Sequence, residues 1–117
     1  MPRSYYIYGL PENIEDFDPE GEIPRMPIGD RATVLRGLSQ LNTSPDVPGS
    51  STLYGPGIEI SLPEGDGVLD FAVLRVSDDT ISWPVMLRIA GEMGWCMWDP
   101  DENRNLYRLK RRHDDLG

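Results

Sequence analysis

Cysteine and histidine are almost absent from this chain of 117 residues, which contains one of each. A single cysteine, Cys96, excludes an intrachain disulfide and a cysteine-rich zinc site, and it fits a reducing compartment or indifference to redox state. Cys96 stands between two tryptophans, which favours an inert core thiol over a nucleophile. The one histidine, His113, lies in a charged terminal segment that is not expected to hold a catalytic base in position. Neither residue therefore predicts an enzyme.

Long apolar runs are also missing. No stretch approaches the roughly 20 apolar residues that a membrane span needs, and residues 1–13 lack the apolar region of a signal peptide. The chain length favours one domain, residues 1–117. We therefore expect a soluble, cytoplasmic protein without a membrane partner.

Basic residues are scarce in the first two thirds of the chain. Residues 1–80 contain 5 basic and 14 acidic side chains, whereas residues 81–117 contain 6 of each, so the net charge of −9 belongs to the first part. Such a surface repels nucleic acids and anionic lipids. The charge predicts a basic protein as partner and no nucleic acid, with the alternative that it only keeps the protein soluble.

An acidic loop is predicted at residues 12–29, because residues 12–22 carry six carboxylates and no base. The candidate partner-binding residues comprise this loop and three later carboxylates: Glu12, Glu15, Asp16, Asp18, Glu20, Glu22, Glu59, Glu64 and Asp66. The alternative is that they are only solvated. A basic C-terminal tail is predicted at residues 108–117, either solvated or paired with the acidic loop.

The apolar pattern predicts strands and helices in alternation. Residues 4–9 and 68–76 are apolar on both faces and are expected to be central strands. Residues 58–62 alternate and are expected to form an edge strand, in a hairpin with 68–76. A helix is predicted at about residues 31–41, capped by Asp30. Residues 42–57 are rich in Ser, Thr, Pro and Gly, which predicts a flexible loop.

The segment from Ile81 to Asp101 predicts a helix followed by a strand. Apolar residues from Met86 to Met93 share one helix face, with Ser82 as the expected N-cap and Gly94 as the C-cap. Residues 95–98 then form a strand that ends at a turn of aspartate and proline. Residues 105–115 are expected to form a short amphipathic helix or an extra edge strand.

The element order is strand, helix, strand, strand, helix, strand. With right-handed crossovers, this order predicts an α+β fold, namely a ferredoxin-like (split βαβ, βαββαβ) two-layer sandwich. Its four-stranded sheet would have both helices on one face.

A sheet covered by helices on one side leaves its other face open. Side chains alternate between the two faces of a strand, so Tyr6 and Tyr8 lie on the face opposite Tyr5 and Ile7. In the same way, Phe71 and Val73 lie on the face opposite Ala72 and Leu74. These four residues are the candidate sheet-face interface, for a partner or for a homodimer. The pattern leaves open which set of side chains faces away from the helices, and either set would give the open face large apolar or aromatic side chains. The alternative is that the N-terminal loop or the C-terminal segment covers them. RNA-binding domains also stack bases on sheet aromatics, but they add positive charge, which this chain lacks.

No metal or cofactor site is predicted. Asp99, Asp101 and Asn103 have the spacing that opens a calcium loop, but Arg104 and Lys110 stand where that loop needs glycine and glutamate. Residues 55–57, Gly-Pro-Gly, match neither a dinucleotide nor a phosphate-binding fingerprint and predict a turn before a strand.

Residues 55–60 and the Gly94-Trp95 pair followed by Asp99 resemble a group of small bacterial proteins of unknown function. These proteins have a GPG-F-x-I-E strand and a GW-x-x-x-D ending, with Ile58 of this chain in place of the aromatic residue. The resemblance spans residues 55–102. In size and acidity the group resembles immunity proteins that neutralise bacterial toxins. The resemblance implies no catalytic residues for this chain.

Three functions follow from these patterns. The first is a non-enzymatic acidic protein-binding module, such as an immunity or antitoxin-type inhibitor of a basic bacterial toxin or enzyme. The second is a homodimeric structural or ligand-sensing domain. The third, and least favoured, is a small metal-assisted enzyme that uses clusters of Asp and Glu.

Overall fold

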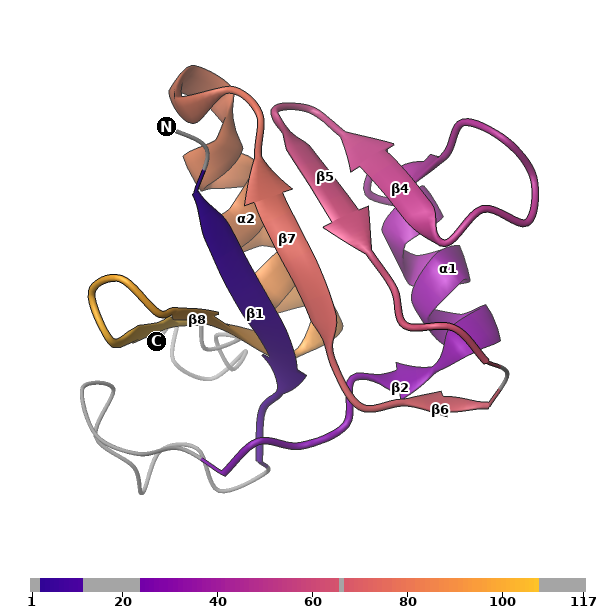
Figure 1. The fold of residues 1–117 in the computed structure, drawn as a ribbon, viewed down its shortest axis with the longest axis horizontal. Helices are drawn as coiled ribbons and strands as arrows, with labels where there is room; N and C mark the ends of the chain where they lie inside the picture. Colours follow the sequence, from indigo (N-terminus) through magenta and orange to yellow (C-terminus); the bar gives the residue numbers. More distant parts are fainter. Residues whose placement is uncertain (1–2, 12–23, 66, 108–117) are drawn as a thin grey trace, which may run out of the picture.

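The computed structural model describes residues 3–11, 24–65 and 67–107. Within them the main element is a seven-stranded antiparallel sheet (Figure 1). Its strands in spatial order are β3 (Ser44–Pro45), β4 (Thr52–Gly55), β5 (Ile58–Ser61), β7 (Ala72–Val76), β1 (Ser4–Gly9), β8 (Trp95–Asp99) and β9 (Arg104–Leu106). Two short strands, β2 (Gly29–Asp30) and β6 (Val68–Leu69), pair separately. The long strand β1 therefore lies inside the sheet, between β7 and β8.

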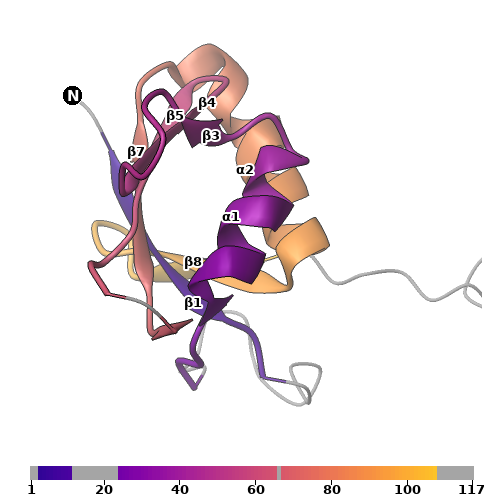
Figure 2. The same cartoon turned by 90° about the vertical axis from the view of Figure 1, so that its right-hand side faces the viewer.

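The helices α1 (Arg31–Ser39) and α2 (Asp79–Met93) lie on the same side of the large sheet (Figure 2). The carboxylate of Asp30 accepts hydrogen bonds from the amides of Ala32 and Thr33 in the first turn of α1, as predicted. Gly94 ends α2 with a left-handed φ of 69°, also as predicted. The predicted N-cap Ser82 is wrong, because the N-cap of α2 is Asp78, four residues earlier, and Ser82 lies buried within the helix.

The predicted ferredoxin-like sandwich with a four-stranded sheet is wrong, because the sheet has seven strands. Two of the added strands, β3 and β4, lie within residues 42–57, where a flexible loop was predicted. The third is β9, which overlaps the start of the segment 105–115, where an edge strand was one of two alternatives; residues 108–115 lie outside the described residues. Since β4 pairs with β5, the edge position predicted for residues 58–62 is wrong too.

The four predicted strands are nevertheless neighbours, in the order β5-β7-β1-β8, and the central positions of β1 and β7 are confirmed. The hairpin of β5 with β7 is present, with Ile58 opposite Val76. Residues 68–76 do not form one strand. Their first two residues leave the sheet as β6 and pair with β2.

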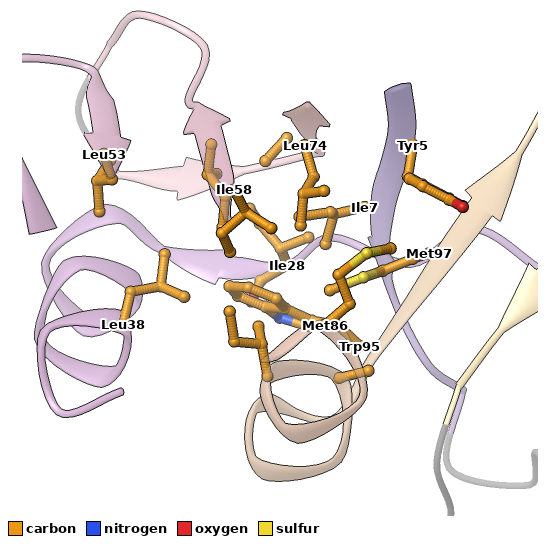
Figure 3. Close-up of a cluster of buried hydrophobic side chains, with 14 of the residues drawn as sticks. Tyr5, Ile7, Ile28, Leu38, Leu53, Ile58, Leu74, Met86, Trp95 and Met97 are labelled. Carbon is orange, nitrogen blue, oxygen red and sulfur yellow. The ribbon is translucent and has the colours of Figure 1, made fainter. Parts of the chain in front are cut away.

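The core lies between the large sheet and the two helices. Figure 3 shows Trp95 in the middle of this cluster, with strand side chains such as Ile7 and Leu74 on the sheet side. Trp95 is 1% exposed, and its indole Nε1–H donates a hydrogen bond of 3.1 Å to the carbonyl of Ile28. The one polar atom of this large side chain is thus satisfied inside the core.

Residues 24–28, which we call the strap, cross the end of β1. Gly9 and Met26 exchange backbone hydrogen bonds, with N···O distances of 2.7 and 3.4 Å, and the amide of Ile28 donates to Leu69. A Cβ atom at Gly9 would lie 2.3 Å from the backbone oxygen of Pro27. Only glycine therefore allows the strap to approach β1 so closely.

Asp99 is 3% exposed at the end of β8. One carboxylate oxygen accepts from the guanidinium of Arg3 at 2.5 Å, and the other accepts from the amides of Asp101 and Glu102. These bonds tie the start of β1 to the turn before β9. They agree with the interpretation of this segment as a turn rather than a calcium loop.

Candidate binding face

The two faces of the large sheet differ in what covers them. Alternate residues of β1 and β7, such as Ile7 and Leu74, are buried beneath the helices. Their neighbours point to the opposite side, and the register places Tyr6 between Val73 of β7 and Trp98 of β8. We call this side the open face. It contains the four predicted interface residues and one more: Tyr6, Tyr8, Phe71, Val73 and Trp98.

Aromatic rings dominate the centre of the open face. The rings of Tyr6 and Trp98 are 5.9 Å apart and tilted by 36°, and those of Tyr8 and Phe71 are 6.4 Å apart and tilted by 33°. Both separations fall within the range in which aromatic pairs attract one another. Tyr6, Tyr8 and Trp98 are partly exposed and Phe71 is exposed, so these rings are paired without being buried.

Arg25 of the strap lies over this aromatic surface. The central carbon of its guanidinium is 5.0 Å from the centroid of the Tyr8 ring and 4.9 Å from that of Trp98. Both distances are within the roughly 6 Å over which a cation is attracted to a ring face. One guanidinium therefore contacts two rings at once, and the bridge from Gly9 to Met26 holds the next residue of the strap in place.

Cys96 lies on the open face opposite Tyr8, yet it is only 4% exposed. Its Sγ is 3.4 Å from the side-chain oxygen of Asn105. Burial raises the pKa of the Cys96 thiol from 9.0 to about 11, and the smaller opposing effect of Arg25 does not offset it. The thiol is therefore protonated at neutral pH, in agreement with the predicted inert cysteine.

We expect Cys96 to react with an aromatic disulfide reagent at about pH 8 at least about 100-fold more slowly in the folded protein than in urea. A pKa raised by about two units lowers the thiolate fraction by about that factor, and burial slows the reaction further. Stopped-flow absorbance measures both rates. Equal rates in the folded and unfolded protein would contradict the burial and the raised pKa of Cys96.

The predicted acidic surface is only partly within the described residues. Glu59 lies on the large sheet opposite Arg75, and their charged groups are 3.9 Å apart. Glu64 is exposed in the segment after β5. The remaining candidates lie outside the described residues: Glu12, Glu15, Asp16, Asp18, Glu20, Glu22 and Asp66. The basic tail, residues 108–117, lies outside them as well.

In the part of the chain that the structure describes, no group of three or more His, Cys, Asp or Glu side chains could hold a metal ion. Neither described helix is both long enough and apolar enough to cross a bilayer.

Sequence reasoning missed two residues of the open face, Trp98 and Arg25. Trp98 had a usable signal, because alternation along β8 sends it to the side opposite the core residue Trp95. No signal in the sequence indicated Arg25. It reaches the open face only because Met26 pairs with Gly9, and no local sequence pattern predicts that pairing.

No family model, curated protein or solved structure matches the chain. The resemblance to small bacterial proteins at residues 55–102 therefore stays a prediction, and the open face is interpreted from its own geometry.

Proposed function

We propose that this chain is a non-enzymatic protein-binding domain that uses the open face to bind a basic protein. The observation that carries the proposal is the cluster of partly exposed aromatic rings on the central strands of the sheet. Aromatic side chains are the residues that most often anchor protein interfaces. An inhibitor of a basic bacterial toxin, which the sequence resemblance implies, is one form of this function.

Charge supports a basic partner in two ways. The net charge of −9 would attract a positively charged protein over long distances and speed its association. The aromatic faces also attract cations at contact, and within this chain the guanidinium of Arg25 already lies over the rings of Tyr8 and Trp98. Long-range attraction and local contact thus favour the same class of partner.

A binding role without catalysis also agrees with the chemistry of Cys96. This thiol is buried and its pKa is raised, so it is a poor nucleophile. A buried free cysteine fits a reducing compartment, and we place the protein in the cytoplasm as part of this proposal.

The test is an affinity pull-down from the source organism at low and high salt, with identification by mass spectrometry. We expect a basic protein to be recovered at low salt, and Trp98→Ala to lower its affinity at least about 10-fold, as for an interface hot spot. Charge reversal at Glu15, Asp16 and Asp18 should slow association.

Trp83→Ala is the matched control, because Trp83 is 49% exposed on α2, on the helix side of the sheet. It should leave binding unchanged. Binding that survives Trp98→Ala, or that Trp83→Ala weakens equally, would overturn the assignment of the open face.

A homodimer through the same face is the second candidate. The same apolar patch favours it, because exposed aromatic clusters also mark self-association surfaces. Sedimentation equilibrium would reveal a dimer that Trp98→Ala dissociates and Trp83→Ala does not. A monomer at high concentration would exclude it.

A further inference from the structure

The strap places a cation on the open face where the proposed partner would bind. Arg25 lies in residues 24–28, which meet the sheet through the backbone pairing of Met26 with Gly9. Its guanidinium contacts the rings of Tyr8 and Trp98 at 5.0 and 4.9 Å. Arg25 itself is exposed, so the arginine covers the rings from the solvent side. A solvent-exposed cation can be exchanged for another one.

The rings beneath Arg25 have the chemistry of a cation-binding surface. Trp98 supplies the aromatic face that attracts cations best, and Tyr8 supplies a second face next to it. The Tyr6 ring, 5.9 Å from Trp98, extends the surface along the sheet. Cys96, opposite Tyr8, adds a neutral thiol and no competing positive charge. Such surfaces recognise guanidinium groups and methylated ammonium groups.

We infer that Tyr8 and Trp98 form a binding site for a side-chain cation of a basic partner, an arginine or a methylated lysine, and that Arg25 occupies this site as an internal ligand in the free protein. This inference rests on the proposed function, because it names the chemical group of the partner that the open face receives. A partner cation would replace Arg25 over the two rings. Removing Arg25 should therefore make the site more available, not less.

The probes are N-acetyl-arginine methylamide and tetramethylammonium, titrated into the ¹⁵N-labelled protein. The three tryptophans provide three indole resonances: Trp98 in the site, Trp83 on α2 as a surface control, and Trp95 in the core as a reporter of folding. The variants Trp98→Phe and Trp83→Phe assign them. We expect only the Trp98 resonance to move in a saturable way.

The deciding variant is Arg25→Ala, with Arg36→Ala on α1 as the matched control. Arg36 belongs to the helix layer, so its loss changes the net charge equally without uncovering the rings. We expect Arg25→Ala to bind both probes about 5-fold more tightly than the wild type, because the internal competitor is gone. Arg36→Ala should bind them as the wild type does.

An unchanged affinity in Arg25→Ala, or a Trp98 resonance that neither probe moves, would overturn the inference. A nucleoside monophosphate that moves Trp98 more strongly than the cations would do so as well, because it would identify a base-stacking surface. If the probes fail while Trp98→Ala still abolishes capture of the partner protein, the proposed function stands and only the cation site is lost.

Discussion

Replacement of Trp95 by alanine is expected to lower the free energy of unfolding by about 3–5 kcal/mol. The Trp95 side chain is 1% exposed and lies between the sheet and the helices, so truncation leaves a cavity in the core. It also removes the donor to the carbonyl of Ile28, which leaves that acceptor without its partner. Urea unfolding followed by circular dichroism measures the loss.

The same substitution at Trp83 is the control. Trp83 is 49% exposed on α2, so its alanine variant should change the free energy of unfolding by less than about 1 kcal/mol. Similar losses of unfolding free energy for Trp95→Ala and Trp83→Ala would contradict the assignment of Trp95 to the core and of Trp83 to the surface. A small loss at Trp95 would mean that neighbouring side chains collapse into the space.

Replacement of Gly57 by alanine is expected to cost about 2–4 kcal/mol of stability. Gly57 has a φ of 73°, which alanine rarely adopts. An added Cβ would also lie 2.6 Å from Cγ1 of Ile81 and 3.0 Å from the backbone oxygen of Asp78. The carbonyl of Gly57 accepts hydrogen bonds from the amides of Ser77 and Asp78, so the clash falls where the β4–β5 turn meets the start of α2.

Gly49→Ala separates the effect of the positive φ from the effect of the steric clash. Gly49 also has a positive φ, 87°, but a Cβ there would meet nothing within 4 Å. Gly49→Ala should lower the free energy of unfolding only by the cost of a left-handed backbone at alanine, about 1 kcal/mol. Thermal unfolding of both variants measures the difference. If Gly57→Ala lost no more than Gly49→Ala, the close approach of the turn to α2 would be refuted.

The strands that sequence reasoning identified are those whose own residues carry the pattern. Aromatic and branched residues from Ser4 to Gly9 predicted β1, and Gly94 marked the end of α2. β4 was missed because Thr52 to Gly55 stand among turn formers, and the strand exists only through its pairing, with Leu53 opposite Ile60. Pairing of this kind is decided by distant parts of the chain.

The start of α2 was misplaced because two good N-caps stand four residues apart. Asp78 takes the role, since its amide is already hydrogen-bonded to Gly57 and its extended backbone continues from β7. Pro84 consequently falls at the sixth position of the helix instead of in its first turn. The choice between Asp78 and Ser82 thus depended on a contact with the β4–β5 turn.

The candidate site was predictable only where its residues follow a local pattern within one strand. Alternation along each strand separated Tyr6 and Tyr8 from Ile7, and Val73 from Leu74, but the register of β1 with β7 was needed to show that Tyr6 and Val73 share a face. The cation on that face could not be predicted, because the position of Arg25 depends on a bridge between segments that are separated by the acidic residues 12–22.

Because β1 lies in the interior of the sheet, its pairing depends on strands that are synthesised much later. β1 pairs with β7 and β8, which follow it by about 65 and 90 residues along the chain. Until those strands are synthesised, both edges of β1 lack their hydrogen-bonding partners. Closing such long loops is slow, and newly made β1 exposes its aromatic side chains and unpaired edges until β7 and β8 are available. The centre of the sheet can therefore form only after β8 has been synthesised.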